Sequence, residues 1–444
     1  MKPSQFNIFI HLGDGRKLAF NSSTAALAEI DPDKYPVIEK ILASPSQLDS
    51  DEEKELAHQL RLGKFLIEDE TDEIAQLKVS NRMQRFGRDA FSLTVAPTLA
   101  CNFKCDYCFE SQEKITMNED TEKALLNFSE RYLKRSESLV LAWFGGEPTL
   151  CLPTIERLQK GFQELSSKHG VFFRSSSIVT NGYLLDKKMS ERLRKLGIKE
   201  AQVTLDGPEK VHDSRRKLHS GKGTFGRIID NLKDSSKILS ILIRVNLDKE
   251  NVDSGYEVVK ILEKEGILPW VNLYFAQVSS SEGVCADLKD RCLSGQEFSS
   301  KVVELYEKLL QRNFNKIIYP VLSAGGFCGA DSAFSFVVSP AGDLFKCWEE
   351  ISSDRDNSVG NIFTSELEPY QKKNLNMYLS WDPFEKSECL SCNILPLCMG
   401  GCPHYGIKNG TKERGDCLPW KYNLKEMLWL KYLCEGNKGK EVRI

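Results

Sequence analysis

Three cysteines stand close together on one short stretch of the chain, CNFKCDYCFE. Cys101, Cys105 and Cys108 are separated by three residues and then by two. Three thiolates on one loop can hold three irons of a [4Fe–4S] cluster and leave the fourth iron open to a non-protein ligand. Structural zinc sites favour paired arms and a closed fourth ligand, so this spacing favours the cluster over zinc. An iron with an open position predicts a reaction site.

A second group of cysteines dominates the C-terminal part of the chain. It consists of Cys328, Cys347, Cys389, Cys392, Cys398, Cys402 and Cys417. The segments CLSC and LCMGGC could hold zinc, but seven ordered cysteines in a chain that also carries the first motif favour further [4Fe–4S] clusters. Cysteine clusters in a chain without an export signal indicate metal binding or redox chemistry rather than structural disulfides.

Composition excludes several classes of function. The chain has 444 residues, 41% of them hydrophobic, which is enough for two or three packed domains. Its 60 Lys and Arg nearly balance its 63 Asp and Glu, and no basic run occurs, so we expect no nucleic-acid partner. No signal-peptide pattern or long apolar run is present, so we expect a cytoplasmic protein without a membrane partner.

The distribution of strand-like, helical and cysteine-rich segments along the chain predicts three domains, at 1–88, 89–315 and 316–444. These domains contain the elements that must position the cysteines. In the first region, FNIFIHL and RKLAFN flank the turn GDG, and PDKYPVIEKILA, SDEEKELAHQLRLG, the strand-like KFLIED and DEIAQLKVSNRMQRF follow. These elements predict a small winged-helix-like domain.

Strand-like and helical segments then alternate six times. The strands are SLTVAPT, LVLAWFGG, SSIVTNG, QVTLDG, SILIRVNLD and NLYFAQV, and the helices lie near 117–135, 153–167, 186–196, 224–238, 253–265 and 296–312. Six βα units predict an α/β fold, a parallel sheet that curls into a partial (β/α)6 TIM barrel, with its site at the carboxyl ends of the strands. The cysteine loop follows the first of these strands.

With this loop in this place, the sequence resembles the radical S-adenosylmethionine (SAM) enzymes across the whole barrel. In that family the amino and carboxylate groups of SAM chelate the open iron, and one electron cleaves SAM to a 5′-deoxyadenosyl radical. The resemblance implies that Tyr107 packs against the adenine of SAM. The alternative is that Tyr107 is an ordinary aromatic residue buried in the loop, with no role in ligand binding. Gly145, Gly146 and Glu147 match the GGE motif, in which glycines allow close approach and Glu147 can accept from the SAM ammonium.

Further strand ends match the family less specifically. They carry Thr180, Asn181 and Gly182 in TNG, Thr204 in place of the common Ser, and Arg244 and Asn246 in IRVNLD. Arg216 aligns with an arginine that meets the SAM carboxylate, which suits a guanidinium because its fork donates two parallel hydrogen bonds. Two alternatives remain open: the neighbouring Arg215 could be the residue that meets the SAM carboxylate, or the arginine could be only a solvated surface charge.

The seven C-terminal cysteines match the family's SPASM domain, which carries auxiliary clusters, so the resemblance implies three [4Fe–4S] clusters in all. Cys389, Cys392, Cys398 and Cys417 would close an outer cluster, and Cys328, Cys347 and Cys402 would hold an inner one. The inner cluster then lacks one ligand, because Phe334 stands where related enzymes often carry a cysteine. Cys285 and Cys292 could replace it, although a free cysteine is more often a small buried apolar residue.

SPASM proteins modify peptides and proteins, and one position helps to separate two subclasses. Anaerobic sulfatase maturases carry an Asp base directly after the cysteine of G-x4-C, whereas GDLFKCWEE places Trp348 there, and an indole N–H cannot accept a proton. Formylglycine chemistry is therefore disfavoured. The N-terminal region resembles the recognition element that binds a leader peptide as an extra strand. The alternative is that this region is only a structural cap on the barrel.

These features predict a radical SAM maturase that installs a crosslink in a ribosomally made precursor peptide, with electrons from a small donor such as a flavodoxin or ferredoxin. A thioether is favoured over a carbon–carbon bond, because an open iron on the inner cluster prefers a soft donor such as a peptide thiolate. Formylglycine formation remains an alternative, as does a non-catalytic iron–sulfur scaffold or electron carrier. No catalytic residue is assigned beyond the SAM-cleaving cluster.

Overall fold

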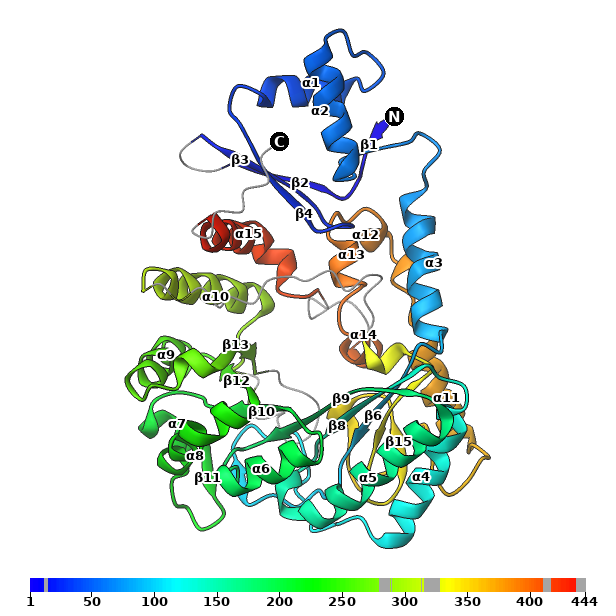
Figure 1. Ribbon diagram of the computed structural model, residues 1–444, viewed down its shortest axis with the longest axis vertical. Helices are drawn as coiled ribbons and strands as arrows, with labels where there is room; N and C mark the ends of the chain where they lie inside the picture. Colours follow the sequence, from blue (N-terminus) through cyan, green and yellow to red (C-terminus); the bar gives the residue numbers. More distant parts are fainter. Residues whose placement is uncertain are drawn as a thin grey trace. The chain divides into compact units, whose positions relative to one another are not determined.

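The computed structural model describes residues 1–11, 15–278, 288, 290–312, 314, 328–409 and 417–436. Most of the predicted GDG turn, the alternative ligand Cys285 and the last eight residues lie outside these ranges. The chain divides into two compact units (Figure 1). We call Phe86–Ile318 with Gly329–Ser380 the barrel unit, and Met1–Arg85 with Tyr319–Cys328 and Trp381–Ile444 the terminal unit.

The barrel unit contains the six predicted βα repeats. Its strands are β6 (Ala90–Val95), β8 (Ser138–Trp143), β9 (Phe172–Thr180), β10 (Glu200–Thr204), β12 (Ser240–Leu247) and β13 (Val271–Gln277). Its helices are α4 (Glu119–Leu133), α5 (Leu152–His169), α6 (Lys187–Lys195), α8 (Phe225–Ile238), α9 (Ser254–Lys264) and α10 (Gly295–Leu310). Neighbouring strands pair in parallel in chain order, so the predicted α/β class and strand arrangement are confirmed.

Three strands that sequence analysis did not predict extend this sheet beyond β6. They are β14 (Ser335–Val338), β15 (Asp343–Phe345) and β16 (Gly360–Asn361), followed by α11 (Pro369–Leu379). Strand β14 pairs in parallel with β6, and β15 and β16 continue in antiparallel register. Strands β14, β15 and β16 therefore belong to the same sheet as β6, the strand that the cysteine loop follows.

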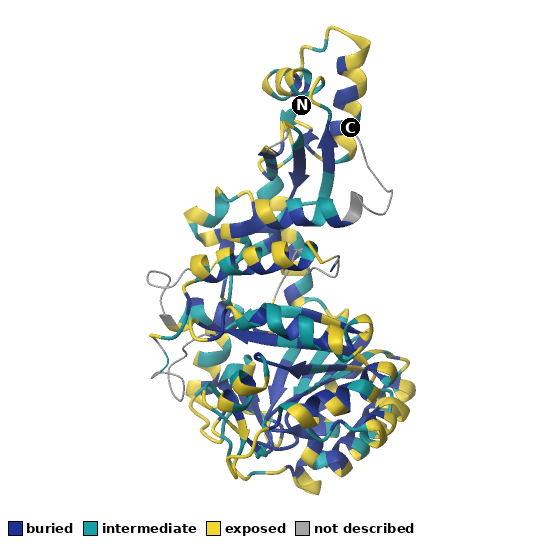
Figure 2. Cartoon of the chain, turned by 90° about the vertical axis from the view of Figure 1, so that its left-hand side faces the viewer, coloured by how far each residue is buried: buried dark blue, intermediate teal, exposed yellow. Residues whose placement is uncertain are grey.

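Packing between helix and strand holds the barrel unit together, and its strands are buried while the outer helix faces are exposed (Figure 2). Phe91, Leu93 and Val95 alternate as buried residues along β6, and Phe91 stacks on Tyr132 of α4 with ring centroids 4.9 Å apart. Such stacking adds to the free energy of apolar burial. No helix among the described residues is long and apolar enough to cross a bilayer.

The terminal unit begins with a three-stranded antiparallel sheet. It comprises β2 (Asn7–His11), β3 (Lys17–Asn21) and β4 (Ala26–Ile30), followed by α1 (Tyr35–Ala43), α2 (Asp51–Leu62) and α3 (Glu73–Phe86), with β1 (Lys2–Pro3) paired to β5 (Leu66–Ile67). The predicted strands and helices are confirmed. Strand β4 was not predicted, because Ala, Leu and Glu favour helix and only its pairing with β3 selects the extended form.

The C-terminal segments of the terminal unit are helical and share a core with this sheet. They are α12 (Ser387–Leu390), α13 (Leu395–Cys398), α14 (Pro403–Asn409) and α15 (Trp420–Gly436). Phe20 and Leu18 of β3 lie in one buried cluster with Leu397 and Leu428. The N-terminal region therefore shares its apolar interior with the segment that carries the C-terminal cysteines. The division into three consecutive domains stays a prediction.

Substitution of Phe20 by Ala tests this shared core. The side chain is 2% exposed, so its removal should lower the free energy of unfolding by about 3–5 kcal/mol. Faster amide exchange should appear in α15 as well as in β2 and β3, because both segments pack on this ring. Leu62→Ala, at a side chain that is 74% exposed, is the control and should change neither quantity. Faster exchange confined to residues 1–85 would contradict a shared core.

Candidate functional site

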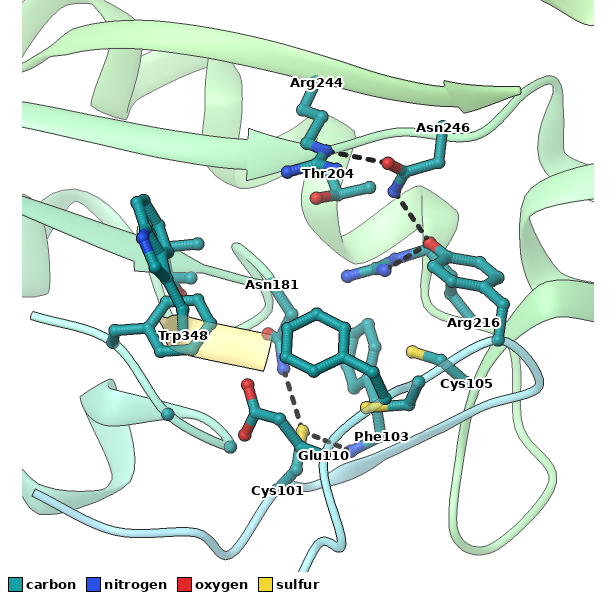
Figure 3. A pocket seen from close by; sticks show the side chains of 18 of the residues that line it. Cys101, Phe103, Cys105, Glu110, Asn181, Thr204, Arg216, Arg244, Asn246 and Trp348 are labelled. Atoms are coloured by element: carbon teal, nitrogen blue, oxygen red, sulfur yellow. Dashed lines mark hydrogen bonds between the residues drawn. The ribbon is translucent and has the colours of Figure 1, made fainter. Parts of the chain in front are cut away.

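A cavity of about 360 Å³ lies at the carboxyl ends of the parallel strands, and it gathers the side chains that sequence analysis placed at those ends (Figure 3). The predicted residues that line it are Cys101, Cys105, Tyr107, Cys108, Gly145, Gly146, Thr180, Asn181, Thr204, Arg216, Arg244, Asn246 and Cys347, the last of which was predicted as a ligand of the inner cluster. All of them belong to the barrel unit. The contacts of these side chains with SAM stay predictions.

The cysteine loop is held by a short antiparallel ladder. Strand β7 (Phe103–Cys105) pairs with β11 (Arg216–Leu218), which follows α7 (Glu209–Arg215), and the register places Arg216 opposite Cys105. The Asp106 amide also donates to the Arg215 carbonyl, at 3.1 Å. Backbone pairing thus brings a guanidinium beside the loop from more than a hundred residues away.

Gly145 and Gly146 hold the start of the same loop. The Gly146 amide donates to the Thr98 carbonyl at 3.1 Å, and the Glu147 amide donates to the Ala100 carbonyl at 2.9 Å. A Cβ on Gly146 would lie 2.3 Å from the Ala100 oxygen, and Gly145 has a φ of +103°. Both positions therefore require glycine. Sequence analysis related these glycines to ligand approach, whereas the structure shows that they make room for the loop backbone.

The Glu147 side chain lies behind the cavity wall rather than in it. It is fully buried, and its Oε1 accepts from the hydroxyls of Thr149 and Thr180, while its Oε2 accepts from the Asn181 amide at 2.7 Å. These bonds set the TNG segment in place, and Asn181 in turn donates to Asn102 of the cysteine loop. Contact between Glu147 and an ammonium group stays a prediction.

The three thiols fit a multi-iron cluster better than a single zinc ion. They line one cavity, and burial raises the pKa of Cys101 and raises that of Cys105 to about 12, while the neighbouring Cys105 thiol adds to the shift of Cys101. Among the described residues, no three potential ligands converge on the position of one metal ion. A cluster binds each thiolate at a different iron, so its ligands need not converge. Binding must also displace the thiol protons.

The Tyr107 hydroxyl joins the polar side chains on one side of the cavity. It donates to Asp206 and accepts from Arg216 Nη1 at 2.6 Å and from Asn246 Nδ2 at 3.1 Å. Arg244 Nε donates to Asn246 Oδ1 at 2.7 Å. Residues from the cysteine loop, the segment after β10, β11 and β12 are therefore ordered as one network, and the Tyr107 ring is fixed by its hydroxyl.

The two neighbouring arginines, between which sequence analysis left a choice, have different surroundings. Only Arg216 lines the cavity. Arg215 is buried outside the cavity lining and pairs with Asp248 at 2.8 Å and with Asp206 at 3.5 Å. Arg215 therefore has a structural role beside the site, and neither arginine is a solvated surface charge.

The opposite side of the cavity was not predicted. Phe144 packs edge-on against Trp348 with centroids 5.1 Å apart, and Phe109 stacks on Phe144. Glu110 lines the cavity beside them with only 7% of its surface exposed. Burial and the nearby Glu147 carboxylate raise the pKa of Glu110 to about 8. Sequence analysis missed Glu110 because a glutamate two residues after a cysteine motif carries no pattern of its own.

The C-terminal cysteines divide between the units. Cys389, Cys392, Cys398 and Cys417 all belong to the terminal unit and influence one another electrostatically, and burial raises the pKa of Cys389 to about 11. Their ligation of an outer cluster stays a prediction. So does the inner cluster, since Cys328 and Cys402 belong to the terminal unit and Cys347 to the barrel unit.

The position that lacks a cysteine has a packing role. Phe334 is 7% exposed and meets the Tyr132 ring edge-on, with centroids 5.5 Å apart. The alternative ligand Cys292 is partly buried.

Substitution of Arg215 by Met tests the buried ion pairs. Asp206 and Asp248 have no exposed side-chain surface, so loss of the guanidinium should destabilise the protein by about 3–5 kcal/mol in chemical denaturation. Arg227→Met is the control: Arg227 is 51% exposed and lies 3.9 Å from Asp186, so its loss should cost under about 1 kcal/mol. An equal decrease in the free energy of unfolding for the two variants would show that the buried pairs stabilise the protein no more than the exposed pair does.

Comparison with known proteins gives a family match within the barrel unit. Residues 95–262 match the Radical SAM superfamily model. A serine-type anaerobic sulfatase-maturating enzyme of Klebsiella aerogenes is 21% identical over 68% of this chain and 77% of its own. The radical SAM cyclopropyl synthase TigE of Paramaledivibacter caminithermalis is 23% identical over 86% of this chain and 85% of its own.

Solved structures share the fold over nearly the whole chain. SuiB of Streptococcus suis bound to S-adenosylmethionine superposes with a TM-score of 0.52 at 17% identity, covering 94% of this chain and 98% of SuiB. SuiB bound to its precursor peptide SuiA superposes with a TM-score of 0.51 at 16% identity, again covering 94% of this chain and 98% of SuiB. The chain thus carries a radical SAM domain and is a radical SAM enzyme, homologous to anaerobic sulfatase maturases and TigE.

Proposed function

We propose that this enzyme cleaves SAM at a [4Fe–4S] cluster held by Cys101, Cys105 and Cys108 and installs a crosslink in a ribosomally made precursor peptide. The observation that carries the proposal is the single cavity in which three thiols meet polar side chains from several strand ends. Support comes from SuiB, which has been solved with SAM and with a precursor peptide. When bound, the cluster supplies the electron that releases a 5′-deoxyadenosyl radical from SAM.

The residues of this chain bind and orient the reactants. Arg216 offers a guanidinium to a carboxylate beside Cys105, and its own orientation is set by Tyr107. Asn246 and Arg244 offer amide and guanidinium donors on the same side. On the other side, Phe144 and Trp348 present aromatic surface that can pack on a peptide and exclude water from a radical.

We propose a thioether as the bond formed. Cys328, Cys347 and Cys402 would hold the inner auxiliary cluster, and three ligands leave an iron suited to a soft donor such as a thiolate. Carbon–carbon bond formation is the second candidate, because the relative TigE is named a cyclopropyl synthase. Formylglycine formation is less well supported despite the sulfatase-maturating relative, since Trp348 lines the cavity and cannot accept a proton.

The decisive experiment couples SAM cleavage to a change in peptide mass. Reconstituted enzyme with SAM, dithionite and a candidate precursor peptide, taken from any small open reading frame found next to the gene, should release 5′-deoxyadenosine, and the peptide should lose two hydrogen atoms per crosslink. A thioether also removes one cysteine from alkylation by iodoacetamide, whereas a carbon–carbon bond does not. Flavodoxin or ferredoxin should replace dithionite as the physiological donor.

Two cysteine variants make this experiment specific. Cys101→Ala should abolish both products, because the cluster loses a ligand. Cys151→Ala should retain both, since Cys151 is partly buried, bonds to Thr116 and does not line the cavity. Methyl transfer without 5′-deoxyadenosine, or cleavage without any change in the peptide, would contradict the proposed function.

Leader recognition can be tested on the intact chain. We propose that the leader adds a strand beside β5, whose sheet contains only β1 and β5 among the described residues. Adding leader peptide should slow amide exchange at residues 64–69, and a peptide without its leader should not be processed although SAM cleavage persists. Deletion of residues 1–85 is unsuitable, because it would expose the shared core. Unchanged exchange at β5, with the leader bound, would show that this region is structural.

A further inference from the structure

The ladder of β7 and β11 has one face toward the cavity and one face toward solvent. Cys105 of β7 and Arg216 of β11 are paired in register, and both side chains line the cavity (Figure 3). Successive side chains of a strand point to opposite faces, so the next pair in the register, Lys104 and Lys217, points away from the cavity. Both lysines are exposed. A single two-stranded ladder thus separates a thiol of the cysteine loop from a surface that carries lysines.

A third lysine is held beside this pair. The Gly221 amide donates to the Leu218 carbonyl at 2.8 Å, and the Leu218 amide donates to the Lys222 carbonyl at 3.0 Å, so a tight turn fixes Lys222 at the end of β11. Lys222 is exposed. In the part of the chain that the structure describes, the ammonium groups of Lys104, Lys217 and Lys222 have no hydrogen bond or ion pair. We call the surface formed by these three lysines the ladder face.

The acidic residues next to the ladder face already have partners. Asp106, which follows β7, pairs with Arg291 at 2.9 Å. Asp213 of α7 accepts from the amides of Thr224 and Phe225 at 2.7 and 2.8 Å. These two carboxylates therefore stabilise neighbouring segments and do not neutralise the lysines.

Folding gives no reason for the two facing lysines. Lys104 and Lys217 lie directly opposite each other, and like charges in such positions destabilise a sheet. The segment after β11 is fixed by other contacts, because the His219 amide donates to the Asn102 carbonyl at 3.3 Å and His219 Nε2 lies 3.1 Å from the Cys101 carbonyl oxygen. The repulsion between the lysines is relieved when an anionic surface covers them.

We propose that the ladder face is the docking surface of an acidic one-electron carrier protein that reduces the cluster. The inference rests on the proposed function, in which the cluster at this loop needs one electron for each SAM that is cleaved. The reduced carrier loses that electron and the cluster gains it, and no atom is exchanged. Docking here brings the carrier to the outer side of the strands whose inner side presents Cys105, and the lysines attract its acidic surface.

The test reverses two charges outside the cysteine loop, with flavodoxin as the probe. In Lys217→Glu with Lys222→Glu, the dissociation constant of flavodoxin at low ionic strength, measured by surface plasmon resonance, should rise by about 10-fold or more. Formation of 5′-deoxyadenosine should slow correspondingly when subsaturating reduced flavodoxin is the donor. With excess dithionite it should be unchanged, because a small reductant needs no docking surface.

Stability and salt dependence separate docking from damage to the fold. Lys217→Glu places a carboxylate opposite Lys104, so the melting temperature should stay the same or rise while flavodoxin binding weakens. Added salt should weaken flavodoxin binding to the wild-type enzyme more than to the variant, because salt screens the attraction that the variant lacks. If the reversed variant assembles its clusters poorly, Lys217→Gln with Lys222→Gln provides the same comparison, and a smaller rise in the dissociation constant is expected.

A matched control changes the net charge equally at the other edge of the sheet. Lys195 and Lys237 are exposed near the ends of α6 and α8, just before β10 and β12 begin, whereas the cysteine loop lies at the carboxyl ends of the strands. Lys195→Glu with Lys237→Glu should leave flavodoxin binding and both rates unchanged. An equal loss in this control would attribute the effect to net charge and overturn the assignment of a docking surface.

Four further outcomes would overturn it. These are flavodoxin binding to the reversed variant as tight as to the wild type; equal slowing with dithionite, which would indicate damage at the cluster; loss of peptide processing with dithionite while SAM cleavage persists, which would assign the ladder face to the peptide; and a wild-type enzyme that binds neither flavodoxin nor a ferredoxin. Each leaves SAM cleavage by the wild-type enzyme with dithionite intact. A wild-type enzyme that cleaves no SAM with dithionite would overturn the proposed function as well.

Discussion

The parallel register of the sheet is the constraint on which the site depends. Strands β6, β8, β9, β10, β12 and β13 pair in chain order, so all six carboxyl ends meet at one edge. Residues that are far apart in sequence, such as Cys101, Asn181 and Asn246, thereby line one cavity. The glycine pair after β8 then holds the cysteine loop at that edge, since any side chain there would strike the loop backbone. Loss of the parallel register, or of the glycine pair that holds the loop, would separate the thiols from the polar residues at the strand ends.

A set of ion pairs centred on buried Arg215, Asp206 and Asp248 supports this edge. Arg215 pairs with Asp206 and Asp248, and Asp206 in turn accepts from the Tyr107 hydroxyl. Arg291 joins Asp248 to Asp106 within the cysteine loop. Buried charges persist only when they are paired, so this set of ion pairs couples the ends of β10 and β12 to the loop. The side chains that face the cavity are positioned by residues that never reach it.

The terminal unit shows how two distant segments of sequence can make one core. Apolar residues on β2 and β3 pack with residues on α13 and α15, and Cys392 and Cys398 lie against this cluster. Leu66 of β5 lies in a separate cluster with Ala19 of β3 and Ile30 of β4. Strand β3 therefore contributes to both cores, one beside β5 and one beside the C-terminal cysteines.

Sequence alone determined the features that are local or strongly periodic. The C-x3-C-x2-C spacing, the six βα repeats and the polar strand ends could be identified because spacing and hydrophobic period depend on neighbouring residues only. Thirteen of the predicted site residues indeed line one cavity. Strands β4 and β14 could not be predicted, because short segments become extended only when a partner strand supplies their hydrogen bonds.

Tertiary structure decided which of several similar side chains faces the cavity. Arg215 and Arg216 are chemically identical and adjacent, yet the pairing of β11 with β7 turns only Arg216 inward. Glu147 belongs to a known motif and lies behind the wall, whereas Glu110 belongs to none and lies within it. A side chain's direction depends on backbone pairing and on the groups that fill the space around it. That information is absent from any single stretch of sequence, and folding alone supplies it.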